Sequence, residues 1–255
     1  LGLLELRAFE MPPHERMSCV QQLLVRALLA RFWRTPDEHR LIKWRTALHD
    51  QFMLPHWVAS DFDDVLHDLD RAGYAFDKRW FEPHFEFRFP YFGEITLDTM
   101  RLELRGALEP WHVLGEESTS TGQARYVDSS VERLQVKVFG LASERYKVLC
   151  NGYEVPLRPT GTNGEYVAGI RYRAWQPPHC LHPRIPIHSP LHIDLYDTWN
   201  ERSLAGCTYH VVHPGGRASD IRPINAAAAE SRRFARFEDR GHRQGQFRPI
   251  PVEPH

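Results

Sequence analysis

The chain has few cysteines, and none of them are paired at a spacing typical of metal or redox sites. Its 255 residues include four cysteines without a Cys-x-x-Cys motif, so the sequence predicts neither a zinc ribbon nor a disulfide framework. Scattered thiols are typical of a reducing compartment, and we expect a cytoplasmic protein. The sequence also lacks a secretory signal and any apolar run near the ~20 residues of a membrane span. We therefore expect no membrane partner.

An excess of charge of one sign is also missing. The 32 Lys and Arg residues are balanced by 33 Asp and Glu residues, which gives a net charge of −1 and a pI near 7.0. No global field therefore favours nucleic acid, and we expect no nucleic-acid partner. Glycine-rich phosphate loops of the P-loop or dinucleotide type are absent as well. Apolar content of 42% and charged content of 25% are ordinary for a globular protein.

The chain does contain a Glu-x-Arg motif three times in its first 105 residues. The copies are Glu5-Leu6-Arg7, Glu86-Phe87-Arg88 and Glu103-Leu104-Arg105. Each lies in a strand-like run, where residues two apart point to the same face of a sheet. Carboxylates are ligands for Mg²⁺, and guanidinium groups match phosphate or carboxylate oxygens. The three copies therefore predict a charged floor that holds a cation together with a polyanion.

The same motif has a simpler interpretation. Glu and Arg two apart on an exposed strand can be solvated, or can pair with neighbouring strands for a fraction of a kcal/mol. The nearby histidines His14, His84 and His112 allow either a ligand or a structural role. His84 is the strongest candidate of the three, because it shares an expected strand face with Glu86 and Arg88.

Histidines are frequent again between residues 182 and 213. Zinc is one interpretation, since His192 and Asp194 share an expected strand face. Prolines make the region rich in turns, which favours a structural role instead. Cys207 and His210 lie three apart in an expected strand and hence on opposite faces, so they predict no direct Cys–His pair. We expect Cys207 to be a buried structural thiol.

Hydrophobic periodicity divides the chain into a helical first part and a strand-rich second part. A first strand is expected over residues 3–9, and a final short helix over 225–239. Three helices are expected over 15–33, from Thr35 to about 52, and from Ser60 to Gly73. Strands are expected over 82–89, 94–97, 101–105, 134–139, 147–150, 166–175, 191–196 and 207–212, with a polar loop or lid over 115–130.

These elements predict an α+β fold, with an antiparallel sheet and packed helices followed by a mainly β, sandwich-like domain. The expected division is 1–117 for the α+β part, 118–222 for the β-rich part, and 223–255 for a helix and a loose tail. The chain opens at Leu1, inside an expected strand. We therefore expect it to continue upstream in a longer protein.

Several stretches together resemble one protein family. They are residues 80–88, 108–117, 126–133, 207–210 and the opening Leu4-Glu5-Leu6-Arg7-Ala8-Phe9-Glu10-Met11-Pro12-Pro13-His14. The family is the one named "putative amidoligase", bacterial proteins related to glutamate–cysteine ligase and glutamine synthetase. The likeness covers nearly the whole chain, which is similar to the C-terminal portion of longer members. It implies a transglutaminase-like domain upstream, because members are often fused to one.

The resemblance implies ATP-dependent joining of a carboxylate to an amine, through an acyl phosphate. The implied cofactors are ATP and Mg²⁺, and the implied partners are small-molecule or peptide carboxylates and amines. The implied metal ligands are Glu5, Glu86 and Glu103. The implied catalytic residues are Arg7, Arg105 and His84. The implied cofactor-binding residues are Arg88 and His14.

Two other functions stay open. A non-catalytic module would bind peptides or proteins through the β-rich segment from 122 to 216, with the Glu-x-Arg strands as ordinary sheet surface. A transglutaminase-type acyltransferase would need a cysteine nucleophile, which the expected placement of Cys207 and His210 disfavours. The ligase hypothesis requires Glu5, Glu86 and Glu103 to converge around one point in a cleft, and the binding module does not.

Overall fold

The structure is a computed structural model that describes residues 5–6, 9–48, 52–120, 122–141, 144–211 and 223–251. Arg7 and most of the strand expected over residues 3–9 lie outside the described residues. The described helices are α1 (Glu15–Arg34), α3 (Pro55–Arg71), α4 (Glu82–Arg88) and α5 (Ala226–Phe234), with the 3-10 turns η1 (Arg45–Ala47) and η2 (Lys78–Trp80). None of the described helices is both long and apolar enough to cross a membrane.

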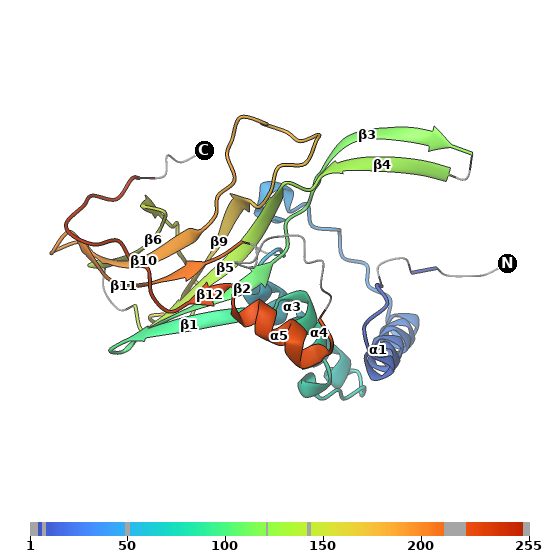
Figure 1. Cartoon of the computed structure of the whole chain (residues 1–255). Coiled ribbons are helices and arrows are strands. Elements are labelled where there is room, and N and C mark those ends of the chain that lie inside the picture. Colours follow the sequence, from blue (N-terminus) through green and yellow to red (C-terminus); the bar gives the residue numbers. More distant parts are fainter. Residues whose placement is uncertain are drawn as a thin grey trace.

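Most of the described strands form two five-stranded antiparallel sheets. The first has the order β1-β2-β5-β9-β8, with β1 (Tyr91–Leu97), β2 (Met100–Ala107), β5 (Val131–Phe139), β9 (Tyr166–Arg173) and β8 (Arg158–Pro159). The second has the order β12-β11-β10-β6-β7, with β12 (Phe237–Glu238), β11 (Arg202–Tyr209), β10 (Leu191–Asp197), β6 (Tyr146–Cys150) and β7 (Tyr153–Glu154). A separate hairpin of β3 (His112–Thr119) and β4 (Gly122–Asp128) projects from the sheets (Figure 1).

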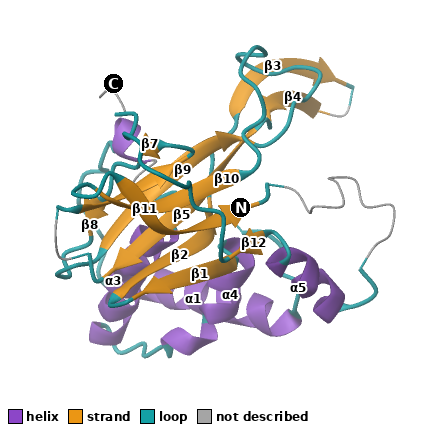
Figure 2. Cartoon of the chain, turned by 60° about the vertical axis from the view of Figure 1, so that its left-hand side comes forward, coloured by secondary structure: helices purple, strands orange, loops and turns teal. Residues whose placement is uncertain are grey.

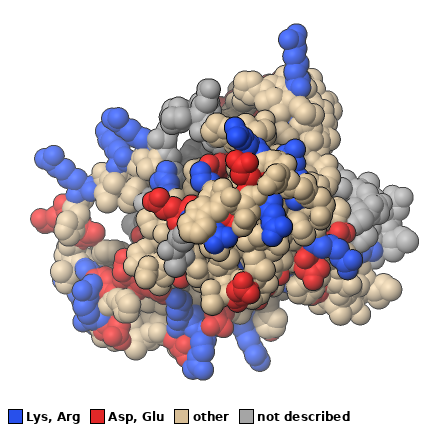
Figure 3. All heavy atoms as spheres, turned by 90° about the vertical axis from the view of Figure 1, so that its left-hand side faces the viewer, with Lys and Arg blue, Asp and Glu red and all other residues tan. Residues whose placement is uncertain are grey.

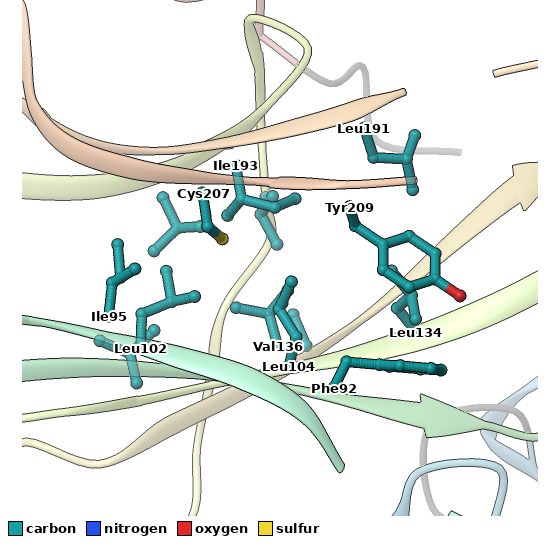
Figure 4. Packing of buried hydrophobic residues seen from close by; sticks show 14 of the residues in the cluster. Phe92, Ile95, Leu102, Leu104, Leu134, Val136, Leu191, Ile193, Cys207 and Tyr209 are labelled. Atoms are coloured by element: carbon teal, nitrogen blue, oxygen red, sulfur yellow. The ribbon is translucent and has the colours of Figure 1, made fainter. Parts of the chain in front are cut away.

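One apolar core lies between the two sheets, and side chains from both of them meet in it (Figure 4). Leu104 and Val136 of the first sheet are both 0% exposed, as are Ile193 and Cys207 of the second. Alternation along each strand produces this core, because every second side chain points to the same face. The expected α+β class with a β-rich part is confirmed.

The expected boundary at residue 117 falls inside the β3–β4 hairpin and is not a break in the first sheet. β2 lies before this boundary and β5 after it, and they pair continuously from Arg101–Phe139 to Ala107–Arg133. The core is shared as well, since Phe92 of β1 packs on Tyr209 of β11 with ring centroids 4.8 Å apart. The inner face of β1 and β2 is apolar and is covered by the second sheet.

The helices lie along the outer side of the first sheet (Figure 2), where α3 contacts β2 and α5 contacts β1. Helix α1 confirms the helix expected over 15–33. Helix α3 begins at Pro55, five residues before the expected cap at Ser60, because Pro55 takes the first helical position. It ends as expected near Gly73, whose φ is +87°, with the Tyr74 N–H donating to the Leu69 carbonyl at 2.8 Å.

Two predictions in this part of the chain are wrong. Residues 36–44, expected to be helical, are irregular and lead into the 3-10 turn η1, and residues 49–51 at the end of the expected helix lie outside the described residues. Residues 82–88, expected to be a strand, form helix α4. The sequence fits both periods there, because Phe81, Phe85 and Phe89 recur every fourth residue. Phe81 and Phe89 are each 4% exposed, while Phe87, which only the alternating pattern would bury, is 56% exposed.

Two polar segments also carry regular structure. Residues 115–130, expected to be a loop or lid, contain most of the β3–β4 hairpin. A two-stranded ribbon away from the core needs no apolar face, so its composition resembles that of a loop. The helix expected over 225–239 is confirmed in its first part as α5. Its N-cap is Asn225, whose side chain accepts a hydrogen bond from the Ala228 N–H at 2.9 Å.

Candidate functional site

A cavity of about 670 Å³ lies between the helices and the outer face of the first sheet, and we call it the site cavity. Its walls come from the first turns of α3, from η2, from α4 and from strands β2 and β5. Its polar lining consists of His56, Lys78, Arg79, Glu82, Glu86, Glu103, Arg105, Gln135 and Lys137.

The alternation of side chains along β2 and β5 determines which residues form the floor of this cavity. Leu102 and Leu104 of β2 point into the core, so Glu103 and Arg105 point to the opposite face. The same alternation in β5 sends Gln135 and Lys137 outward. The antiparallel register then places Glu103 opposite Lys137 and Arg105 opposite Gln135.

Arg105 joins two of the predicted carboxylates. Its Nε donates to Glu103 Oε1 at 2.9 Å, and its Nη1 donates to Glu86 Oε2 at 2.8 Å. Nη1 also donates to the Phe89 carbonyl at the end of α4, at 3.2 Å. Burial disfavours the charge of Arg105, but Glu86 and Glu103 together raise its pKa above the ordinary value. The guanidinium is therefore held by groups from β2 and α4.

Glu86 is bound from a third direction by the C-terminal helix. Arg233 of α5 donates through Nη1 to Glu86 Oε1 at 2.7 Å and to the Tyr91 carbonyl at 2.6 Å. The Tyr91 N–H donates to Glu86 Oε1 at 3.0 Å. Burial opposes the charge of Glu86, but these donors and Arg105 outweigh it and hold its pKa below the ordinary value. Glu86 is therefore ionised at neutral pH.

A second polar group surrounds Lys137. Its Nζ donates to Glu165 Oε1 at 2.7 Å and lies 3.3 Å from His56 Nδ1. Because an ammonium group only donates, Nδ1 accepts, and the neutral His56 ring carries its proton on Nε2. Burial and the charge of Lys137 lower the pKa of His56, against the opposing effect of Glu165. His56 is therefore an uncharged N–H donor at pH 7.

The first turn of α3 also reaches the cavity. The His56 N–H donates to Gln135 Oε1 at 2.9 Å, which satisfies one of the free N–H groups of the helix end. The first turn of α3 has no acidic residue. The positive end of the helix dipole therefore adds to Lys137 and favours an anionic ligand.

The outer rim of the cavity carries two further cations. Lys78 donates to Asp63 Oδ2 at 2.6 Å, and Arg79 binds Asp77. Acidic and basic side chains are interspersed over the face of the molecule that Figure 3 presents. That face has no large field of one sign, in keeping with the balanced composition.

The structure brings together Glu86, Glu103 and Arg105, three of the eight predicted site residues, although Glu86 lies on a helix and not on the expected strand. Glu5 lies in an exposed, irregular segment and does not line the cavity. Arg7 lies outside the described residues.

The other three predicted residues point elsewhere. His84 also lies on α4, where its Nε2 is 3.2 Å from the Met17 carbonyl of α1. Arg88 of α4 binds Glu10 at 3.2 Å. His14 is the N-cap of α1, and its Nδ1 accepts from the Arg16 N–H at 3.1 Å. None of the three lines the site cavity.

Among the described residues, no group of three or more His, Cys, Asp or Glu side chains is placed to hold a metal ion. This holds for Glu5, Glu86 and Glu103, and also for the histidines from 182 to 210. Glu86 and Glu103 instead share Arg105. The metal-ligand roles of the three glutamates stay predictions.

The sequence analysis missed several residues that line the cavity, and also Arg233, which binds Glu86 from outside it. Gln135 and Lys137 had a usable signal, since they alternate with Leu134, Val136 and Val138. No signal in the sequence indicated the register of β5 against β2, because the tertiary fold determines which residues pair when they lie some thirty positions apart. Arg233 and His56 had no signal, since each is an ordinary polar position on a helix.

Comparison with known proteins gives one family. No curated protein and no solved structure matches the chain. A family model described as "Putative amidoligase enzyme (DUF2126)" matches residues 1–255. The chain therefore belongs to this amidoligase family.

Proposed function

We propose that the site cavity binds ATP and joins a carboxylate to an amine through an acyl phosphate. Membership of an amidoligase family supports a general ligase role. The observation that carries the proposal is the junction of Glu86, Glu103 and Arg105 on the floor of a cavity of about 670 Å³. This volume lies within the range of small-molecule and cofactor sites.

The cationic side of the cavity would receive the phosphates. Lys137, the Nε2–H of His56 and the N-terminal end of α3 supply positive charge and N–H donors. Lys78 and Arg79 at the rim add two more cations. The small molecule or peptide that supplies the carboxylate would lie against Arg105, whose orientation is already determined by two glutamates.

The donor set at the floor fits Mg²⁺ better than a metal held by protein ligands alone. Magnesium is usually bound by one or two carboxylates together with substrate phosphates and water. Glu86 and Glu103 would hold it, and it would neutralise charge on the phosphates when bound. Glu5 stays a predicted ligand although it does not line this cavity. Loss of metal-dependent ATP turnover in Glu5→Ala would support that prediction, and unchanged turnover would contradict it.

The contribution of the protein would be positioning and electrostatic stabilisation. Phosphoryl transfer needs the two reactants in line and the negative charge neutralised. Arg105 is held by β2 and α4 before any ligand binds, so little reorganisation is needed when charge develops against it. Arg233 would act as a positioning residue, because it contacts Glu86 but does not itself line the cavity.

A pair of variants on one strand tests the proposal. Arg105→Met removes the guanidinium of the cavity. Arg101→Met is its matched control, because Arg101 lies on the same face of β2 and pairs with Glu94 at 2.9 Å outside the cavity. In calorimetric titration with ATP and Mg²⁺, we expect the Arg105 variant to bind at least about tenfold more weakly than wild type. The Arg101 variant should bind like wild type.

Equal binding by the two variants, or no ATP binding by the wild-type chain, would contradict the proposal. ADP release that depends on both a carboxylate and an amine then tests the ligase step. The binding-module hypothesis predicts no ATP binding and no effect of either variant.

A transglutaminase-type reaction has less support. Cys207 lies in the core and is 0% exposed, and burial raises the pKa of its thiol far above the ordinary value. The nucleophile would therefore be neither ionised nor accessible. His210 instead lies 3.0 Å from Glu238.

Two further parts of the proposal concern the cellular compartment of the protein and its neighbouring domain. All four cysteines are free thiols, which supports a place in the cytoplasm. The resemblance to longer family members supports a transglutaminase-like domain upstream.

A further inference from the structure

A second cavity lies where the β3–β4 hairpin leaves the sheets, and we call it the hairpin cavity. Its volume is about 220 Å³, and its lining comes from the facing ends of β3 and β4, the start of β5, the end of β9 and the loop from 181 to 188. It shares no lining residue with the site cavity. Val131 lines one cavity and Gln135 the other, and four residues of strand separate them by about 13 Å.

Arg173 of β9 is a buried cation in the lining of this cavity. It is 3% exposed, and its guanidinium donates to three neutral acceptors. These are the carbonyls of Leu181 at 2.7 Å and His182 at 3.0 Å, and Cys180 Sγ at 3.3 Å. Its Nε is buried and has no hydrogen-bond partner among the described residues. A buried guanidinium that no carboxylate contacts is costly.

The carboxylate that lines the same cavity, Asp128, forms no ion pair with Arg173. Burial opposes the charge of Asp128, but hydrogen bonds from Ser130 and Leu181, together with the nearby charge of Arg173, hold its pKa below the ordinary value. Asp128 Oδ1 accepts from the Ser130 N–H at 2.9 Å, and Oδ2 accepts from the Leu181 N–H at 2.8 Å. Arg171, the other cation of the lining, is bound to Glu109 at 2.9 Å. Among the described residues, Arg173 is therefore left without a carboxylate in contact.

The remaining lining combines a donor with an apolar wall. The Arg173 backbone N–H donates to His188 Nδ1 at 3.0 Å, so a neutral His188 carries its proton on Nε2. Val131, Leu181 and Ile185 supply the apolar part. The volume is below that of drug-sized sites, so the ligand must be small.

We propose that the hairpin cavity binds a small aliphatic carboxylate, with its anionic group against Arg173 and its apolar body against Val131 and Ile185. The apolar wall favours an organic carboxylate over inorganic phosphate. This proposal stands on residues that the ligase proposal does not use.

The test uses two ligands of the same shape. Isobutyrate carries the charge, and isobutyramide is its neutral counterpart. In an NMR titration of the whole chain, the backbone amide signals of Arg173 and Leu181 should shift and saturate with isobutyrate, with a dissociation constant of about 1 mM. Isobutyramide should give no saturable shift. Inorganic phosphate, titrated separately, should leave both signals in place.

Two variants link the shifts to the cavity. Ile185→Trp fills the cavity from an exposed position and should weaken isobutyrate binding at least about tenfold. Arg173→Met should have the same effect, provided that its circular dichroism spectrum matches wild type. If this variant does not fold, Ile185→Trp decides. Arg184→Met is the control, since it removes a cation from the same loop outside the lining.

Four results would overturn the proposal. The first is a lack of saturable shifts with isobutyrate. The second is equal shifts from isobutyrate and isobutyramide, which would show that charge plays no part. The third is phosphate binding in place of isobutyrate, which would assign the cavity to inorganic anions. Unchanged isobutyrate binding in Ile185→Trp would place the ligand elsewhere.

Discussion

The inner and outer faces of strands β2 and β5 differ completely, although the same stretches of backbone build both. Leu104 and Val136 point inward and are 0% exposed. Their neighbours Arg105 and Lys137 point outward and line the site cavity. The core thus holds the strands in register, and that register determines which charged side chains meet. We expect substitutions on the inner face to change stability and those on the outer face to change ligand binding.

The largest effect on stability should come from the inner face. Leu104→Ala removes a fully buried side chain and should lower the free energy of unfolding by about 2–5 kcal/mol. Urea unfolding at neutral pH measures this loss. The matched outer-face change, Glu103→Ala, should cost about 1 kcal/mol or less while weakening ATP binding. Equal losses of stability in the two variants would contradict the division of roles.

Alkaline pH should also act through the inner face. Burial raises the pKa of Tyr209 to about 12, with minor effects of Arg236 and Tyr172. The unfolded chain therefore loses this proton first, and stability should fall as the pH rises from the ordinary tyrosine value of about 10 toward 12. The loss is on the order of 3 kcal/mol. Urea unfolding should be measured between about pH 9 and 11, about one pH unit either side of the ordinary tyrosine pKa. Over this range, the free energy of unfolding of Tyr209→Phe should depend less on pH than that of wild type. An unchanged dependence would place the alkaline effect elsewhere.

On the outer face, the loss of Arg105 should have an intermediate effect on stability. Arg105→Met leaves Glu86 and Glu103 without their shared partner, which should cost about 1–2 kcal/mol in the free energy of unfolding. The exposed pair of Arg101 and Glu94 serves for comparison, and Arg101→Met should cost between about 0 and 1 kcal/mol. Thermal and urea unfolding of both variants checks the order. A larger cost for Arg101 would show that the cavity network does not stabilise the fold.

The titration of Glu86 at acidic pH should have the smallest effect, and it acts through the outer face. Because the pKa of Glu86 is lowered, its contribution is present above the ordinary glutamate pKa and is lost as the pH falls through the lower folded value. Glu86 is partly exposed, so we expect less than about 1 kcal/mol. Glu86→Gln should reduce the fall in stability below pH ~4.5, near the ordinary glutamate pKa. The same slope in wild type and variant would assign the acid response to other carboxylates.

Local pattern predicted the strands well and helix α4 poorly. Leu102, Leu104, Leu134 and Val136 alternate with polar residues, and each points into the core as that pattern requires. The phenylalanines from 81 to 89 fit both an alternating and a four-residue period. Packing of Phe85 on Phe62 of α3, with ring centroids 5.8 Å apart, selects the helix. The period of the sequence is ambiguous there, and contacts from another part of the chain resolve it.

The candidate site was predicted in part for the same reason. Glu103 and Arg105 share a strand face by local geometry, so their pairing followed from the sequence. Glu86 reaches them only because α4 lies over β2. Arg233 joins from α5, 147 residues away. Contacts of such separation depend on the packing of whole elements, which no local motif encodes.

The sequence by itself determined the alternation of β2 and β5, the end of α3 near Gly73, the balanced charge and the family resemblance. These depend on neighbouring residues or on the whole composition. Only the tertiary structure decided that the parts before and after residue 117 share one sheet, that α4 is helical, and that two glutamates meet one arginine in a cavity. Each of these depends on burying apolar surface between segments distant in the chain, and that free energy depends on the complete packing and not on any single stretch.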